Sequence, residues 1–297
     1  MAAQVEFRKI REFGEVIGDT FLFIRQNFKP LGKAFLYLCG IFIAGGILTA
    51  MMAQFKLIDE SNRMSIAPGY RNDFLAFIIS KFAIHYLLMY VFLFLTYLSI
   101  HLTVLSYIAL YVQKGNVAPN VEEVWTYFKF YFFRMLGNAI VMFLFFVLCF
   151  ACCIIPGIYI FPAVTLFYPV MIIENGALRY SFNRASRLLK GEWWITAAIL
   201  LVIWIITYAC TTFAQMPGII VMMANTFTHA GKPITAAYAI ISSVCQYISQ
   251  VFMVIPIIGS TLIYFNLVER KESTGLMDRI SSLGKETNQT DIHPEEY

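Results

Sequence analysis

The chain has 297 residues, of which 59% are hydrophobic and only 13% are charged. Soluble domains are about 45–50% apolar and about 25% charged, so this composition argues against a soluble domain and predicts an integral membrane protein. The net charge is +4, and no extended basic surface lies outside the apolar runs, so nucleic acid is not an expected partner.

Uncharged runs long enough to cross a bilayer recur along the chain. A bilayer core needs about 20 apolar residues in a helix. The runs are 34–53, 82–112, 135–173, 193–216 and the stretch between Lys232 and Glu269. As one helix, 135–173 would be about 58 Å long, nearly twice the hydrocarbon thickness. We therefore expect two helices there, and an all-α bundle of six spans over 1–270.

The change of direction inside the run 135–173 is predicted at Pro156 and Gly157. Proline lacks an N–H group and glycine favours turns, so the two helices would cover roughly 135–153 and 158–174. The turn would lie at a membrane surface, where water satisfies the open backbone.

Three charged segments have the pattern of amphipathic surface helices, namely 7–28, 120–134 and 175–194. Pro30 is expected to end the first of them before the first span. Because each segment precedes two spans, the chain divides into possible units of about 1–113, 114–175 and 176–270. The alternative is that amphipathic linkers simply follow the inner surface of a polytopic protein.

Basic residues indicate the orientation of the spans. All but five of the 22 Lys and Arg residues fall in the terminal segments and in the linkers on their side. Because basic residues accumulate in cytoplasmic loops, both termini are predicted to be cytoplasmic, and the turn at Pro156 and Gly157 is predicted to face the outside. The polar tail 271–297 is predicted to be disordered. The opposite side carries Lys56, Arg63, Arg71, Lys81 and Lys232.

The stretch "IIPGIY", followed by Glu174 and "SFNRASRLLKGEWW", resembles the bacterial membrane-protein superfamily named for the membrane domain of glycerophosphodiester phosphodiesterases. The resemblance is clearest over 135–200, and it implies a multi-pass fold in the bacterial cytoplasmic (inner) membrane. It implies no phosphodiesterase activity, because that activity belongs to a separate soluble domain in the naming members. The matching positions are Pro156, Gly157, Tyr159, Pro169, Glu174, Ser181, Ser186, Lys190, Gly191 and Trp194.

Few residues suggest chemistry. Glu174, at the inner mouth of the fourth span, would begin the next helix, pair with Arg179 or Arg184, or contribute to a site. No second carboxylate lies at a spacing suited to acid–base catalysis. Cysteines 149, 152 and 153 share a helix face without a histidine or carboxylate, so no metal is expected there. We expect no catalytic residue, no cofactor and no metal.

Polar residues in two spans suggest either interhelical hydrogen bonds or a solute path. In the last span they follow helical spacing, and Tyr97, His101 and Ser106 would face them from the second span. The members of the last span are Ser242, Gln246, Ser249 and Gln250.

The segment 175–194 also carries a candidate surface for lipid or protein. Basic side chains near a membrane attract anionic headgroups, and tryptophan favours the interface. The residues of this surface are Arg179, Arg184, Arg187, Lys190, Trp193 and Trp194.

Two functions follow from these features. The first is a non-enzymatic scaffold or regulatory partner of other membrane proteins, whose surface helices contact membrane lipids. The alternative is a transporter or channel for a small or amphiphilic solute, and an intramembrane enzyme is the weakest hypothesis. The sequence leaves the oligomeric state and the identity of any partner open.

Overall fold

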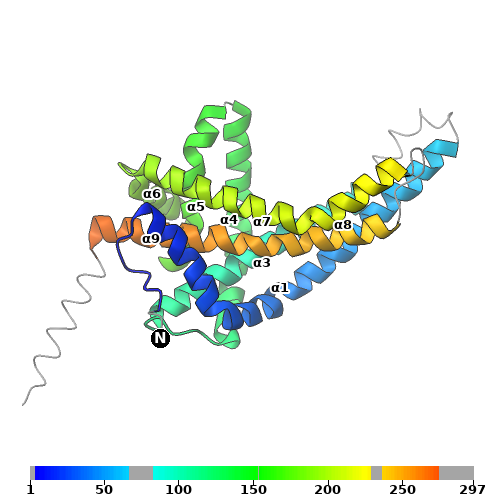
Figure 1. Ribbon diagram of the computed structural model, residues 1–297. Helices are drawn as coiled ribbons and strands as arrows, with labels where there is room; N and C mark the ends of the chain where they lie inside the picture. Colours follow the sequence, from blue (N-terminus) through cyan, green and yellow to red (C-terminus); the bar gives the residue numbers. More distant parts are fainter. Residues whose placement is uncertain (1–3, 67–82, 153, 229–235, 274–297) are drawn as a thin grey trace, which may run out of the picture.

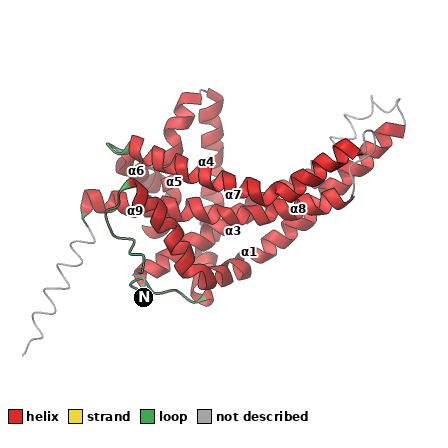
Figure 2. Cartoon of the chain, in the orientation of Figure 1, coloured by secondary structure: helices red, strands yellow, loops and turns green. Residues whose placement is uncertain are grey.

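The computed structural model describes residues 4–66, 83–152, 154–228 and 236–273, and in these ranges all regular secondary structure is helical (Figure 2). The predicted all-α class is therefore confirmed. Of the predicted tail 271–297, residues 271 and 272 are helical, and 274–297 lie outside the described residues. The helices are α1 (Phe13–Ile66), α3 (Ala83–Gln113), α4 (Val121–Cys152), α5 (Ile154–Ile173), α6 (Leu178–Leu189), α7 (Trp193–Thr228), α8 (Ala236–Ser249), η3 (Gln250–Met253) and α9 (Val254–Glu272).

Six helical stretches are long and apolar enough to cross a membrane, which confirms the multi-pass character of the chain. They are α1, α3, α4, α5, α7 and the continuous stretch from α8 to α9. Many large apolar side chains on these helices are exposed, as expected of surfaces that contact lipid.

The helices pair in hairpins (Figure 1). α1 lies beside α3, and α7 lies beside α8; together these four form an elongated arm. α4 and α5 form a third hairpin, which runs crosswise to the arm. α9 passes through the centre, where the residues from Val254 to Glu269 are buried. The core of the molecule therefore lies where the α4–α5 hairpin meets the arm around α9.

Two prolines occupy positions that differ from the prediction. Pro30 does not end a helix; it lies inside α1, which bends in its first half (Figure 1). Proline inside a long helix commonly produces a bend without ending the helix. Pro156 and Gly157 are not the turn either, because α4 ends at Cys152 and α5 already begins at Ile154. Pro156 is tolerated in the first turn of α5, where its missing N–H group would lack a helical partner anyway.

Of the three amphipathic segments, only 175–194 contains a separate helix, α6. Its inner face buries Ser181, Ala185, Leu188 and Leu189. The segment 120–134 is continuous with the apolar part of α4, and 7–28 is continuous with the rest of α1 from Phe13 onward. The predicted threefold unit is therefore not confirmed by the helix boundaries that the structure describes.

Close approach of α1 and α8 depends on a glycine. A Cβ atom at Gly46 would overlap the ring of Tyr247, which is fully buried, whereas a Cβ atom at Gly40 would meet nothing within 4 Å. We therefore expect Gly46→Leu to lower the free energy of unfolding by about 1–3 kcal/mol, because overpacking strains a filled interface. SDS titration in mixed micelles measures the change. Gly40→Leu is the control, and an equal loss in both variants would contradict the prediction.

Candidate functional site

A large apolar cleft lies between the α4–α5 hairpin and the helices α3, α7, η3 and α9. Its volume is about 1270 Å³, which exceeds the roughly 300–1,000 Å³ of typical small-molecule pockets. None of the described residues that line it is Asp, Glu, Lys or Arg. Apolar side chains such as Leu98, Met135 and Phe161 form most of the wall. This lining suits a hydrocarbon chain and disfavours an ion.

The cleft opens to the outside along α3 and α4. Tyr90 and Val91 on α3 and Phe143 and Leu144 on α4 line the cleft and are exposed; Phe143 is 61% exposed. In a membrane an exposed apolar rim is in contact with lipid. A hydrophobic molecule would therefore enter the cleft sideways from the bilayer.

His101 lies in this cleft beside two tyrosines. Its Nδ1 is 3.1 Å from the backbone oxygen of Tyr97, and its ring lies 4.1 Å from the Tyr97 ring and 5.7 Å from the Tyr168 ring. A carbonyl oxygen only accepts, so Nδ1 carries the proton, and Nε2 of a neutral ring is an acceptor. The predicted interhelical role of His101 is thus replaced by a bond within α3, and one ring nitrogen stays available as an acceptor.

Two side chains that line the cleft each carry a buried polar atom with no hydrogen-bond partner among the residues that the structure describes. The Trp204 Nε1 and the Gln250 Oε1 are both buried and unpaired. Close by, Gln215 donates from Nε2 to the Ser249 Oγ at 3.1 Å. Buried polar groups are nearly always paired, so a free donor and a free acceptor in one cleft point to a missing polar partner.

The predicted polar stripe of the last span is divided by the fold. Ser249 and Gln250 line the cleft together with His101, whereas Ser242 and Gln246 do not belong to its described lining. Ser242 lies against Gly218 of α7 and donates to the Ala239 oxygen. The stripe is therefore partly helix packing and partly cleft.

Sequence reasoning missed Trp204 and Gln215. Gln215 lies near the end of the run 193–216, where a search for polar residues inside apolar runs would have found it. Trp204 carries no such signal, because a tryptophan inside an apolar helix resembles any other large apolar residue.

At the end of α5, Glu174 belongs to an ion-pair cluster. Its carboxylate accepts from the Arg184 Nε at 3.0 Å, the Tyr180 hydroxyl at 2.7 Å and the Tyr264 hydroxyl at 2.8 Å. Arg184 also donates from Nη2 to the Glu272 Oε2 at 2.8 Å. Two hydrogen bonds raise the pKa of Arg184. The bond to Glu272 has the larger effect, and the bond to Glu174 has the smaller one. Glu174 therefore pairs with Arg184, one of the alternatives predicted from the sequence.

The hydrogen bond from Tyr180 to Glu174 raises the pKa of the Tyr180 phenol, because a phenolate would face a carboxylate. The satisfied partners of Glu174 give this cluster the character of a structural joint between α5, α6 and α9. Glu174 is not one of the described residues that line the cleft, and none of those residues carries a carboxylate.

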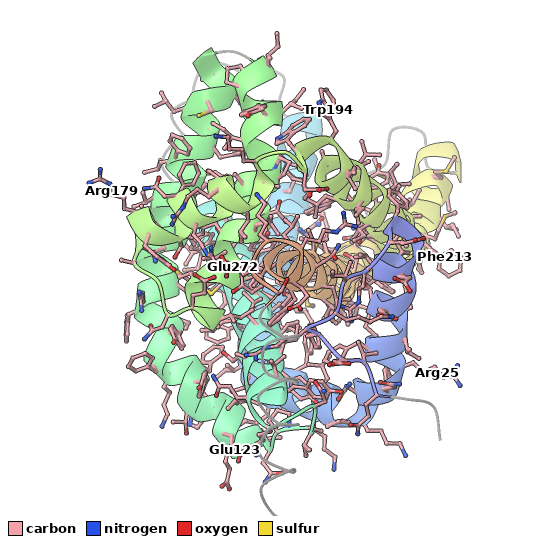
Figure 3. All side chains as sticks on the ribbon, turned by 90° about the vertical axis from the view of Figure 1, so that its left-hand side faces the viewer. Arg25, Glu123, Arg179, Trp194, Phe213 and Glu272 are labelled. Atoms are coloured by element: carbon pink, nitrogen blue, oxygen red, sulfur yellow. The ribbon has the colours of Figure 1, made fainter. Side chains whose placement is uncertain are left out.

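The predicted lipid or partner surface divides into exposed and packed residues. Arg179, Arg187, Lys190 and Trp194 are exposed, and Figure 3 shows Arg179 pointing away from the molecule. Arg184 is not free to contact lipid, because it donates hydrogen bonds to the carboxylates of Glu174 and Glu272. Trp193 packs on Tyr159, with the rings 5.3 Å apart and Nε1 donating to the Tyr159 oxygen at 3.0 Å.

In the described part of the chain, no group of three or more His, Cys, Asp or Glu side chains is placed to hold a metal ion. Cys153 and the side chain of Cys152 lie outside the described residues, so the structure does not address the cysteine face of 149–153. Comparison with protein families, with curated proteins and with solved structures gives no match.

Proposed function

We propose that the chain is a non-enzymatic, multi-pass membrane protein whose apolar cleft binds the hydrocarbon chain of an uncharged amphiphile. The observation that carries this proposal is the cleft of about 1270 Å³ without a charged residue in its lining. The distribution of basic residues and the resemblance over 135–200 favour a bacterial cytoplasmic membrane with both termini in the cytoplasm.

The polar groups of the cleft favour an amphiphile over a pure hydrocarbon. The Trp204 Nε1 would donate to an ester or hydroxyl oxygen, and the Gln250 Oε1 would accept from a hydroxyl group. A charged headgroup would find no counter-charge among the described lining residues, and burying it unpaired would be costly. A monoacylglycerol, with one chain, one ester and two hydroxyl groups, fits these requirements.

Filling the cleft should weaken the binding of the amphiphile strongly. Val164 lines the cleft, so the larger side chain in Val164→Trp should occupy the space of the ligand. We expect the affinity for radiolabelled monooleoylglycerol to fall at least tenfold, which corresponds to about 1.4 kcal/mol of binding free energy. A scintillation proximity assay on protein in mild detergent measures it. Val141→Trp is the matched control, since Val141 is exposed on α4 and not part of the described lining. Equal binding by both variants and the unchanged chain would refute the proposal.

Removing the free acceptor should reveal the class of amphiphile. Gln250→Leu should weaken monooleoylglycerol about 2- to 10-fold, the range of one neutral hydrogen bond, because the ligand hydroxyl loses its acceptor. Methyl oleate has no hydroxyl, so its binding should not change. If both ligands weaken alike, Gln250 acts through packing and the assignment of its role is wrong.

Binding of an amphiphile is compatible with the transporter hypothesis. The solute would then enter sideways from the bilayer, and not through a water-filled path between the helices. The scaffold or regulatory role is a second candidate, favoured by the exposed Arg179, Arg187 and Lys190 on α6. Protein partners that co-purify in mild detergent and are lost when these three residues are changed to Gln would support it.

A further inference from the structure

The crosswise position of the α4–α5 hairpin bears on how the molecule sits in a bilayer. α9 ends in Arg270, Lys271 and Glu272 after a long apolar stretch, so this end marks one boundary of the hydrocarbon layer. The depth of other helices is therefore read from their contacts with these three residues.

α6 lies across the charged end of α9. Arg184 bonds Glu272; Lys271 donates to the backbone oxygens of Arg187 at 2.7 Å and Lys190 at 2.9 Å. The Arg270 Nη1 lies 3.7 Å from the Oε2 of Glu192, a residue just beyond the end of α6. A single turn of α9 thus meets Arg184 and Arg187 of α6 and also Lys190 and Glu192 just beyond its end, as expected where α6 crosses this end of α9. Figure 3 looks along α9 and places Glu272 at this end.

α5 lies beside α6 and is held at both of its ends, by α6 at one end and by the first residue of α7 at the other. Glu174, after the last residue of α5, bonds Arg184 and Tyr180. Tyr159, near the start of α5, stacks on Trp193, the first residue of α7. The two positions are about 22 Å apart along a helix. Both are tied through α6 and residue 192 to the same turn of α9, so α5 runs along the boundary and not through the layer.

α4 follows the same direction. Its Phe145 packs edge-on against Phe182 of α6, with the ring centres 5.6 Å apart. The alternative, in which α5 crosses the bilayer parallel to α9, would carry Trp193 and its neighbour Glu192 about 22 Å from the level of Glu174. Placing a charged side chain at that depth in the bilayer raises the free energy of insertion by about 2.5–3.5 kcal/mol.

We infer that the α4–α5 hairpin does not cross the bilayer: it lies in the cytosolic leaflet, and only α1, α3, α7 and the α8–α9 stretch span. α6 covers the hairpin on the side of the cytosol. The hairpin tip presents apolar side chains to the lipid, including Ile155, which is 80% exposed, and Ile158. No charged residue occurs between Arg134 and Glu174, so nothing in the tip requires an aqueous compartment. Four spans, like six, leave both termini on one side.

The partner of this surface is the lipid leaflet, because its apolar residues are continuous with the exposed apolar rim of the cleft on α4. The inference does not depend on what the cleft binds. It reverses the sequence-based expectation that the turn between α4 and α5 faces the outside.

The test uses the fluorophore NBD and its impermeant reductant dithionite. In a full-length chain with the six cysteines replaced by alanine, a single cysteine is introduced at Ile155, at Leu57 or at Trp194 and labelled. Leu57 lies at the far end of α1 and reports the outer side; the exposed Trp194 reports the cytosolic side. Dithionite is then added outside right-side-out vesicles or outside inverted ones.

The label at Ile155 should be bleached only in inverted vesicles, like the label at Trp194 and unlike that at Leu57. Bleaching in right-side-out vesicles would overturn the inference, because the tip would then have crossed the bilayer. Protection in both preparations would also overturn it, because a label that dithionite reaches from neither side lies deep in the hydrocarbon layer or under protein, and not near the cytosolic boundary. Ile158→Cys repeats the measurement on the same surface in case the first variant does not fold.

Discussion

Arg11→Met should lower the free energy of unfolding by about 3–5 kcal/mol, because it removes a buried guanidinium group and leaves the partly buried Asp19 carboxylate and several backbone oxygens without their donor. The Arg11 side chain is 1% exposed. It donates to the Asp19 carboxylate at 2.7 Å and to the backbone oxygens of Phe7 at 2.9 Å and Lys9 at 3.1 Å. Arg11 also donates from Nη2 to the backbone oxygen of Glu6. SDS titration in mixed micelles measures the loss.

The size of this effect follows from what Arg11 holds in place. It folds the non-helical segment before α1 back onto the bundle, so that Phe7 packs against Phe23, Tyr111 and Phe265 with ring centres 5.1 to 5.9 Å apart. Without the guanidinium group the carbonyls of this segment lose their donors, and the aromatic cluster loosens with them.

Arg25→Met is the control for Arg11→Met. Arg25 lies on the same helix as Asp19, is exposed and points away from the molecule (Figure 3). Surface substitutions of this kind change stability by about 0.5 kcal/mol or less. A loss below about 1 kcal/mol in Arg11→Met, or an equal loss in both variants, would contradict the role assigned to Arg11.

The elements that depend on composition and periodicity were predictable from the sequence. The absence of charge in 135–173 predicted two helices there, and the alternation of basic and apolar residues in 175–194 predicted α6. Helix ends were less predictable. Pro30 is accommodated inside α1 because a proline bends a long, packed helix without ending it.

The direction of the helices was not predictable from hydropathy. A helix as apolar as α5 satisfies the same criterion whether it crosses the bilayer or lies along its surface, so length alone cannot separate the two. What separates them is a set of contacts between residues far apart in the chain, such as Arg184 with Glu272. The cleft depends on the same arrangement, since α3, α4, α7 and α9 all contribute to its wall.

Arg184→Met is the second variant with a large expected effect, a loss of about 2–4 kcal/mol of unfolding free energy. It removes the donor that Glu174 and Glu272 share, and the Glu174 side chain is only 16% exposed. We place the expected loss below that of Arg11→Met because the Glu272 side chain is 37% exposed and water solvates part of its charge.

A double substitution separates the ion pair from packing. Adding Glu272→Gln to Arg184→Met removes one of the two unpaired carboxylates, so the double variant should be more stable than the sum of the single losses implies. Arg187→Met is the control on the same helix: its side chain is exposed, and its backbone oxygen continues to accept from Lys271. Additive losses for Arg184→Met and Glu272→Gln would show that the two residues are not coupled, and the hydrogen bonds between them would then not stabilise the joint between α6 and α9.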